Sequence, residues 1–216
     1  HYFIKYLNQR NIFPADAYEN ILSIMQKYKI ALEKEIDYSI LRENYIQTYA
    51  LGLKGQKYSK IKDLANEFIS NNLELLHQET ISIVNLFSDY LKIVITGEPE
   101  ELMIPLQKIL GFDKIHCTIL EADSSDILTG KMVQNNGLKE GKLKAVHEIL
   151  RDNEIDLEKS YAFGDTPHDL PLLEKVSHPF VLDGNPDMIR IAKLKGWTIA
   201  SHETVLNVLK DDTGIK

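Results

Sequence analysis

The sequence has very little cysteine, no long apolar run and no excess of basic residues, and each shortage excludes a class of protein. Because Cys117 is its only cysteine, an internal disulfide framework is excluded, and we expect a reducing, cytoplasmic location. No apolar stretch approaches the roughly 18 residues that a membrane-spanning helix needs, so we expect no membrane partner. The net charge of −7 argues against nucleic-acid binding, which normally uses a basic surface.

The remaining composition is typical of a soluble globular protein. The chain has 216 residues, of which 44% are hydrophobic and 26% are charged. This length fits one large domain or two small ones and allows a substantial core to be buried. We expect Cys117, which lies in an apolar-rich stretch, to be a small buried residue of that core.

The first part of the chain has the apolar periodicity of helices. Between residues 13 and 36, Met25 lies four residues after Ile21 and three after Leu22, as on one face of a helix. The same pattern begins at about Ser39, at residue 59 and at residue 80. We therefore expect an all-helical domain over residues 12–80.

From residue 92 onward, short strand-like runs alternate with helical ones. This alternation is typical of an α/β fold with a doubly wound, mostly parallel sheet. We expect the α/β core to comprise residues 1–11 and 81–216, with a hairpin-like excursion through Gly130 and the helical domain inserted between the two parts. The strands are expected at residues 91–96, 114–123, 159–163, 178–184 and 197–200, and the helices at 99–111, 141–152, 170–176 and 186–196.

Polar residues follow several of these strands at the positions where α/β sheets bind ligands. In open α/β sheets, ligands lie beyond the carboxyl ends of the strands. Thr96 and Gly97 end one strand, Lys142 begins a helix, and Asp165 and Asp169 follow another strand. A hydroxyl, an ammonium group and free N–H groups suit phosphoryl oxygens, and carboxylates suit Mg²⁺ with its bound waters. The set predicts a phosphate site with a divalent cation.

Each of these residues also has an ordinary structural role. Thr96 can satisfy a strand end or cap the following helix, and Lys142 can be a solvated side chain. Asp165 can be an N-cap, and Asp169 a first-turn acid that the helix dipole favours. The Gly-Asp-x-x-x-Asp spacing at residues 164–169 is more specific than the others. The order of all the residues along the chain, each at a suitable junction, favours the functional interpretation.

Four other polar residues are weaker candidates. Asp183 and Asn185 can lie at the rim of the site, although a turn built by Asp-Gly-Asn-Pro is the stronger interpretation. His168, between the two aspartates, is expected at the surface. Arg42 can bind a substrate carboxylate, although an exposed helix charge is the more common role.

Three motifs in this order resemble a known family: IVITGEPEELMIPL (93–106), EGKLKAVHEIL (140–150) and YAFGDTPHDLPLLE (161–174). They are similar to the second, third and fourth motifs of haloacid dehalogenase-like hydrolases, and most of all to the phosphoserine-phosphatase-like branch. That branch carries a helical cap inserted after its first strand. Segments 1–7, 127–131 and 184–197 also resemble it, so the resemblance covers essentially the whole predicted core.

The resemblance implies a Mg²⁺-dependent phosphatase that acts on a small phosphorylated metabolite. In this family an aspartate attacks phosphorus and forms an aspartyl-phosphate, which water then hydrolyses. Carried over, Thr96 would hold a phosphoryl oxygen, and Lys142 would neutralise charge on the nucleophile and the phosphate. Asp165 would ligate Mg²⁺, and Asp169 would support it, also through water. The cap would choose the substrate, which the sequence does not identify.

One motif of the family is missing from these residues. The first motif, Asp-x-Asp, carries the nucleophile and the general acid, and no Asp-x-Asp occurs in the 216 residues. The stretch that resembles the region downstream of this motif begins at His1. We therefore expect the nucleophile to precede His1, and we expect the 216 residues alone to show no phosphatase turnover.

Other functions fit less well. A phosphate-accepting domain of the response-regulator type uses similar groups, but in a different order along the chain. A dinucleotide-binding fold would need Gly-x-Gly-x-x-Gly after a strand, and the sequence has none. The remaining alternative is a catalytically silent relative that binds a ligand or a partner through its cap.

Overall fold

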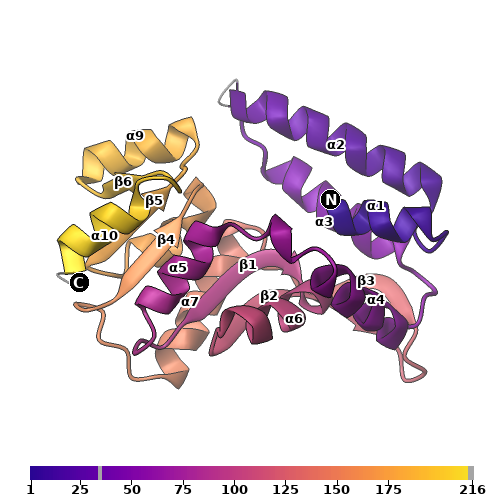
Figure 1. The fold of residues 1–216 in the computed structure, drawn as a ribbon. Coiled ribbons are helices and arrows are strands. Elements are labelled where there is room, and N and C mark those ends of the chain that lie inside the picture. Colours follow the sequence, from indigo (N-terminus) through magenta and orange to yellow (C-terminus); the bar gives the residue numbers. More distant parts are fainter. Residues whose placement is uncertain (34–35, 214–216) are drawn as a thin grey trace. The chain divides into compact units, whose positions relative to one another are not determined.

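The computed structural model describes residues 1–33 and 36–213, and the chain forms two compact units (Figure 1). The first unit comprises residues 1–75 and 93–138, and the second comprises residues 76–92 and 139–216. Both units mix helices and strands, which confirms the α/β fold class. The assignment of residues 12–80 to a separate helical domain stays a prediction, because the first unit also includes the strands that follow.

The helices of the first unit confirm the periodicity of the sequence. Their apolar faces meet in one core, in which Leu7, Ile21, Leu53 and Ile61 are fully buried. Residues 34 and 35, at the end of the segment predicted to be the first long helix, lie outside the described residues. The helices are α1 (Tyr2–Gln9), α2 (Ala15–Glu33), α3 (Ser39–Gly52) and α4 (Tyr58–Ser70), followed by a short 3₁₀ turn (Leu73–Leu75).

The strands of the first unit form a three-stranded sheet in the order β1-β2-β3. Strands β1 (Ile93–Pro99) and β2 (Lys114–Ala122) are parallel and are joined by helix α6 (Glu100–Leu110). Strand β3 (Leu128–Gln134) returns antiparallel to β2, which confirms the hairpin-like excursion through Gly130. Leu120 and Leu128 from this hairpin pack into the same core as the helices.

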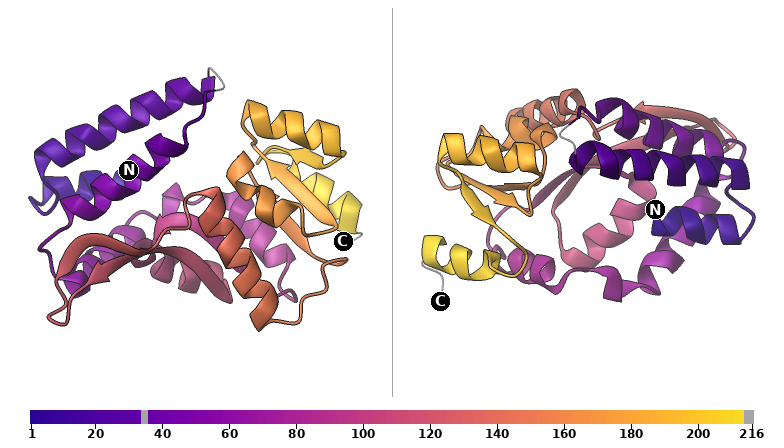
Figure 2. Two further views of the ribbon diagram at one scale, coloured as in Figure 1. Left: turned by 180° about the vertical axis from the view of Figure 1, so that it is seen from behind. Right: turned by 90° about the horizontal axis from the view of Figure 1, so that it is seen from above.

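The second unit contains a parallel three-stranded sheet in the order β4-β5-β6. Its central strand sends alternate side chains to opposite faces, as the pleat requires. Phe180 packs with residues of α5 and α10, and the next residue, Val181, packs with residues of α8 and α9. In the ribbon, the helices nearest the yellow end of the colour scale, α9 and α10, lie on opposite sides of this sheet (Figure 2). The elements are α5 (Gln78–Leu86), α7 (Lys139–Asp152), β4 (Tyr161–Gly164), a 3₁₀ turn (Pro167–Asp169), α8 (Leu170–Leu173), β5 (His178–Leu182), α9 (Pro186–Lys195), β6 (Thr198–Ala200) and α10 (Val205–Thr213).

The structure tests the expectation for the single cysteine. Cys117 is 3% exposed on β2, which confirms its place in the core. Burial, and then the charges of Glu100 and Glu101, raise the pKa of its thiol to about 12, so the thiol stays protonated. In the part of the chain that the structure describes, no helix combines the length and apolar character needed to cross a membrane.

Candidate active site

Thr96 lies inside β1, which continues to Pro99, in the stretch where the pairing register with β2 shifts. Its hydroxyl oxygen accepts a hydrogen bond from the N–H of Glu98, with 3.1 Å between the two atoms. The sequence placed the end of this strand at Thr96, and the structure extends it by three residues to Pro99. A hydroxyl that accepts one hydrogen bond keeps its own proton to donate, so Thr96 remains suited to hold a phosphoryl oxygen.

Gly97 lies where two segments of backbone meet. A β-carbon added to Gly97 would lie 2.6 Å from the α-carbon of Gly137, so no side chain fits at this position. The carbonyl oxygen of Gly97 accepts a hydrogen bond of 2.9 Å from the hydroxyl of Thr118 on β2. The close approach explains why this turn requires glycine, and the hydrogen bond fixes the orientation of its peptide group.

In the second unit, Gly164 ends β4 and gives room for the side chain of Asp169. A β-carbon on Gly164 would lie 2.5 Å from that of Asp169. The carboxylate of Asp169 accepts hydrogen bonds from the N–H groups of Asp165 and Thr166, both at 3.1 Å. Thr166 and Asp169 also form a capping box on the short 3₁₀ turn. The Gly-Asp-x-x-x-Asp spacing therefore builds a closed turn around one carboxylate.

Lys142 projects from the first turns of α7 and forms an ion pair with the other oxygen of Asp169. The two residues are 7% and 5% exposed, so the interpretation of Lys142 as a solvated side chain is wrong. Burial raises the pKa of Asp169, but the charge and hydrogen bond of Lys142 and the two backbone N–H groups outweigh it, and the pKa lies below its usual range. The Asp169 carboxylate is therefore ionised at neutral pH.

Asp165 differs from Asp169 in that its side chain is exposed, at the end of β4. Its carbonyl oxygen accepts a hydrogen bond of 2.9 Å from the N–H of Asn185, which caps α9 through its own side chain. His168, expected at the surface, is only 9% exposed in the 3₁₀ turn. That expectation is wrong.

Asp183, the other candidate for the rim, holds a turn. Its φ of 46° is in the left-handed region, which aspartate tolerates better than most residues. Its carboxylate pairs with the ring of His202 and also accepts a hydrogen bond of 3.2 Å from the N–H of His202. Through these contacts, Asp183 connects the end of β5 to the segment that follows β6.

The carboxylates of Asp165 and Asp169 suit Mg²⁺ binding in two different roles. Among the described residues, no group of three or more His, Cys, Asp and Glu side chains is arranged to hold a metal ion. Mg²⁺ does not need such a cage, because it is usually held by one or two carboxylates, several waters and substrate phosphate oxygens. The exposed carboxylate of Asp165 suits direct ligation. Both oxygens of Asp169 are already engaged, so its suitable role is to support the ion through a water.

The structure thus brings Lys142, Asp165 and Asp169 together in the second unit. Thr96 and Gly97 lie together in the first unit. Each group has the local geometry that its proposed role needs. A single phosphate site that uses all five residues stays a prediction.

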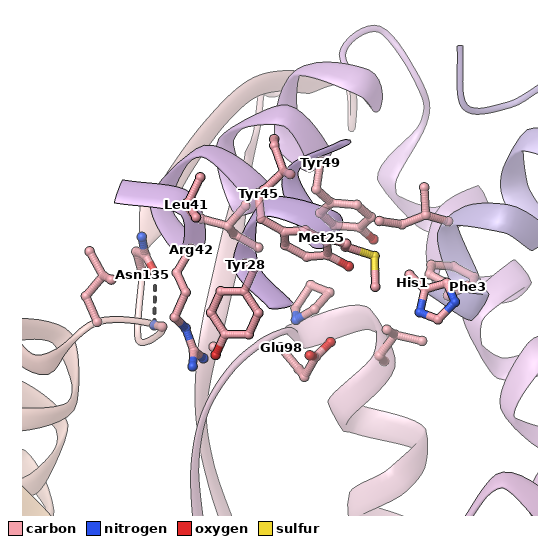
Figure 3. Close-up of a pocket in the computed structure, with 18 of the residues that line it drawn as sticks. His1, Phe3, Met25, Tyr28, Leu41, Arg42, Tyr45, Tyr49, Glu98 and Asn135 are labelled. Atoms are coloured by element: carbon pink, nitrogen blue, oxygen red, sulfur yellow. Dashed lines mark hydrogen bonds between the residues drawn. The ribbon is translucent and has the colours of Figure 1, made fainter. Parts of the chain in front are cut away.

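A pocket in the first unit was not predicted from the sequence (Figure 3). Its volume is about 490 Å³, and most of its lining is apolar or aromatic. Arg42, expected to be an exposed helix charge, is half-buried and lines this pocket. Gly97 and Glu98 also line it. The pocket therefore adjoins the turn proposed to hold phosphate. Its tyrosines lie on α2 and α3, and its phenylalanine lies on α1.

The motifs can now be compared with known proteins. The family model described as haloacid dehalogenase-like hydrolase matches residues 3–174, which is most of the chain. The chain belongs to the haloacid dehalogenase-like hydrolase family. The match extends from α1 through the Gly-Asp turn, so it includes all five candidate residues of this hydrolase.

The matches to curated relatives cover about half of the residues of this hydrolase. A histidinol-phosphatase of Neisseria meningitidis serogroup C (strain 8013) is 32% identical over 110 residues, which is 50% of each chain. A probable phosphatase of Mycobacterium tuberculosis is 29% identical over 109 residues, 50% of this chain and 37% of the relative. The chain therefore spans about half the length, or less, of the curated relatives that it matches.

Solved structures support the fold. A protein of unknown function from Bordetella pertussis Tohama I matches with a TM-score of 0.71 at 21% identity, covering 93% of this chain and 89% of its own. A phosphoserine phosphatase, solved as an analogue of its phospho-aspartyl intermediate, matches with a TM-score of 0.56 at 17% identity and covers 85% of this chain and 80% of its own. At these identities the likeness concerns the fold alone.

Proposed function

We propose that this hydrolase is a Mg²⁺-dependent phosphatase that hydrolyses a small phosphomonoester through an aspartyl-phosphate. The observation that carries the proposal is the buried ion pair of Lys142 and Asp169 at the end of β4. Burying two charges is costly, and a core of the same volume filled with apolar groups would often be at least as stable. Such a pair beside an exposed carboxylate, Asp165, suits a site that handles charge.

Each residue of the chain has a role in this mechanism. Thr96 would donate its hydroxyl proton to a phosphoryl oxygen, and the N–H groups of the turn at Gly97 would bind the same phosphoryl group. Lys142 would place its charge beside the reacting carboxylate and phosphate, and Asp169 would fix its ammonium group in that position. Phosphoryl transfer depends mainly on such positioning and charge stabilisation.

The cation would be held by Asp165, with Asp169 supporting it through a water. When bound, Mg²⁺ would neutralise charge on the phosphate oxygens and orient the phosphoryl group. The attacking aspartate is proposed to lie outside the 216 residues, since they contain no Asp-x-Asp. The 216 residues alone are then expected to be inactive. Residues 12–80 are proposed to act as the helical cap that selects the substrate.

The product of the full reading frame that contains these residues gives the direct test. We expect it to hydrolyse p-nitrophenyl phosphate with Mg²⁺ and to lose this activity with EDTA. Asp165→Asn should lower kcat and raise the Mg²⁺ concentration needed for half-maximal rate. Lys142→Ala should lower kcat at least about 100-fold, by loss of charge stabilisation.

The control variant is Lys144→Ala, on the same helix. Lys144 is 69% exposed and 3.9 Å from Glu148 in a surface pair, so its loss should leave kcat unchanged. Full activity in Lys142→Ala, or activity that does not respond to metal, would overturn the proposed mechanism. The rival function, a silent relative that binds a ligand or a partner, predicts no turnover in the wild type or in any of these variants.

A further inference from the structure

Glu101 is a buried carboxyl that lies close to the proposed phosphate turn and that the proposed mechanism does not use. It belongs to the first turn of α6, is 1% exposed, and is separated from Gly97 by three residues. Among the described residues of the first unit, no other acidic side chain is buried to this extent. Burying a carboxyl is costly unless hydrogen bonds satisfy its oxygens, whereas an apolar side chain of similar size avoids this cost. The partners of the two oxygens therefore indicate what Glu101 does.

Both oxygens of Glu101 accept hydrogen bonds from tyrosines, and the two tyrosines come from different helices. Tyr49 of α3 donates its hydroxyl proton to Oε1, and the hydroxyl of Tyr58 on α4 lies 3.4 Å from Oε2. The two tyrosines are themselves buried, at 2% and 6% exposed. The Tyr58 hydroxyl is also 3.1 Å from Oε2 of Glu100, so two neighbouring carboxyl groups of α6 share it. Helices α3 and α4 thus hold the first turn of α6 from two sides.

The segment that joins Glu101 to the proposed phosphate turn is stiff. Pro99 is the N-cap of α6, and its ring restricts its φ, which is −74°. Pro99 also pairs with Thr118 of β2, whose hydroxyl donates to the carbonyl oxygen of Gly97. The backbone of Gly97 in turn lies against that of Gly137, which leaves no space for a side chain. A displacement of Glu101 would therefore be transmitted to Gly97 and not absorbed between them.

The same hydrogen bonds reach the pocket of the first unit. Tyr49 lines this pocket, and its ring is stacked with that of Phe13, with 6.2 Å between centroids (Figure 3). Burial, and then the charge and hydrogen bond of Glu101, raise the pKa of Tyr49 well above its usual value, so its hydroxyl stays protonated and can donate to Glu101. The bond between Tyr49 and Glu101 thus connects the pocket wall to the first turn of α6.

We propose that Glu101 is a positioning residue, and that its hydrogen bonds to Tyr49 and Tyr58 hold the turn at Gly97 in the geometry that binds phosphate. The inference rests on the proposed function, because it takes this turn as part of the phosphate site. Since Glu101 is buried, it acts through the backbone of α6 and not by contact with the substrate. An apolar side chain in its place would fill the space but leave two buried hydroxyls without this acceptor.

The test compares Glu101→Leu, which removes both acceptors, with Glu101→Gln, whose amide oxygen can still accept from Tyr49. In the product of the full reading frame with Mg²⁺, Glu101→Leu should lower kcat/KM for p-nitrophenyl phosphate at least about 10-fold, because misplacing a group that binds phosphate costs rate. The inhibition constant of inorganic phosphate should rise by a similar factor. Glu101→Gln should restore most of both values.

Two further variants separate positioning from a loss of stability. Tyr49→Phe keeps the ring and removes one hydroxyl, so it should change both values in the same direction by a smaller factor. Ile61→Ala is the control, because Ile61 is fully buried on α4 in the same core. It should lower the urea midpoint and leave kcat/KM and phosphate inhibition unchanged at a temperature at which it is folded. The amide resonance of Gly97, recorded without substrate, should move in Glu101→Leu and stay in place in Ile61→Ala and Glu101→Gln.

The outcomes separate the inference from the proposed function. A loss of phosphate binding in Glu101→Leu that Glu101→Gln largely restores and Ile61→Ala does not show supports the inference. Wild-type phosphate binding in Glu101→Leu, or an equal loss in Glu101→Gln or Ile61→Ala, overturns it while the phosphatase function stands. If Glu101→Leu does not fold, Tyr49→Phe takes its place in each comparison.

If the wild type does not hydrolyse p-nitrophenyl phosphate, the proposed function fails, and the Gly97 resonance decides whether Glu101 positions the turn. A shift confined to Glu101→Leu and Tyr49→Phe supports this role. An unmoved resonance, or the same shift in Ile61→Ala or Glu101→Gln, overturns it.

Discussion

A β-carbon on Gly164 would lie 2.5 Å from the β-carbon of Asp169, so the Gly-Asp turn closes only when its first residue has no side chain. The carboxyl carbon of Asp169 would also lie within 2.9 Å, and a methyl group of Leu173 within 3.0 Å. Three contacts of this kind cannot all relax by rotation of one side chain. Gly164 thus determines where the Asp169 carboxylate lies, and with it the ammonium group of Lys142.

The first prediction tests this steric requirement. Gly164→Ala should destabilise the protein by about 1–3 kcal/mol, the usual cost of overpacking, measured by urea unfolding. In an Asp169→Gly background the added methyl group meets no β-carbon, so the same substitution should cost less. A coupling energy of at least about 1 kcal/mol between the two changes is expected. Additive effects would show that the two residues do not constrain each other.

The second prediction concerns the buried ion pair. Lys142→Met keeps much of the side-chain volume but leaves the Asp169 carboxylate buried without its cation, which should cost about 3–5 kcal/mol in urea unfolding. Lys144→Met on the exposed face of α7 should change stability by less than about 0.5 kcal/mol. If the two variants are equally stable, the ion pair does not contribute to the folded state.

The third prediction follows from Glu101, a carboxyl that is 1% exposed on α6. Burial raises its pKa, hydrogen bonds from Tyr49 and Tyr58 oppose the rise, and the nearby charge of Glu100 adds to it, so the pKa lies above its usual range. A carboxyl with a raised pKa binds its proton more tightly in the folded state. Its contribution is therefore most favourable below the unfolded pKa and is lost as the pH rises through the folded value.

Glu101→Gln, which resembles the protonated form, should remove this dependence. The unfolding free energy of the wild type relative to Glu101→Gln should fall as the pH rises from about 4.3, the usual pKa of glutamate, through the raised value. Urea unfolding between pH 4 and 8 measures the difference, and Glu43→Gln on the exposed part of α3 should show no such trend. A wild type that gains stability over this range would contradict the assignment.

The limits of sequence reasoning are visible at particular residues. The end of β4 could be predicted from its apolar run and glycine, so Asp165 and Asp169 lie at the junction expected for them. Thr96 does not, because β1 continues beyond it to Pro99. The ion-pair partner of Lys142 could not be predicted, because Asp169 lies in a turn 27 residues later in the chain. Spacing alone indicated a metal-binding role for Asp169, and it gave no sign that both its oxygens would be engaged.

The pocket was missed for a related reason. Periodicity shows which face of a helix is apolar, and it does not show whether that face meets another element or lines a cavity. Tyr45 of α3 thus lines the pocket together with Glu98, which belongs to a segment more than 50 residues later in the chain. Helix α10 was also not predicted, since its short apolar pattern follows the last expected strand.

The last prediction concerns Gly97, where the obstacle is backbone. A β-carbon there would lie 2.6 Å from the α-carbon of Gly137 and 3.3 Å from its nitrogen, and no rotation of a side chain can relieve such contacts. Gly97→Ala should therefore cost about 1–3 kcal/mol in urea unfolding and displace the turn that carries Thr96 and Glu98.

This displacement should appear in the amide resonance of Thr118, whose hydroxyl donates to the Gly97 carbonyl. In the product of the full reading frame, kcat/KM for p-nitrophenyl phosphate should fall at least about 10-fold, because misplacing a group that binds phosphate costs rate. Gly111→Ala is the control: its φ is +70° and nothing lies within 4 Å of an added β-carbon, so it should lower stability while leaving kcat/KM unchanged. If Gly97→Ala retains wild-type kcat/KM, this turn does not hold the phosphate.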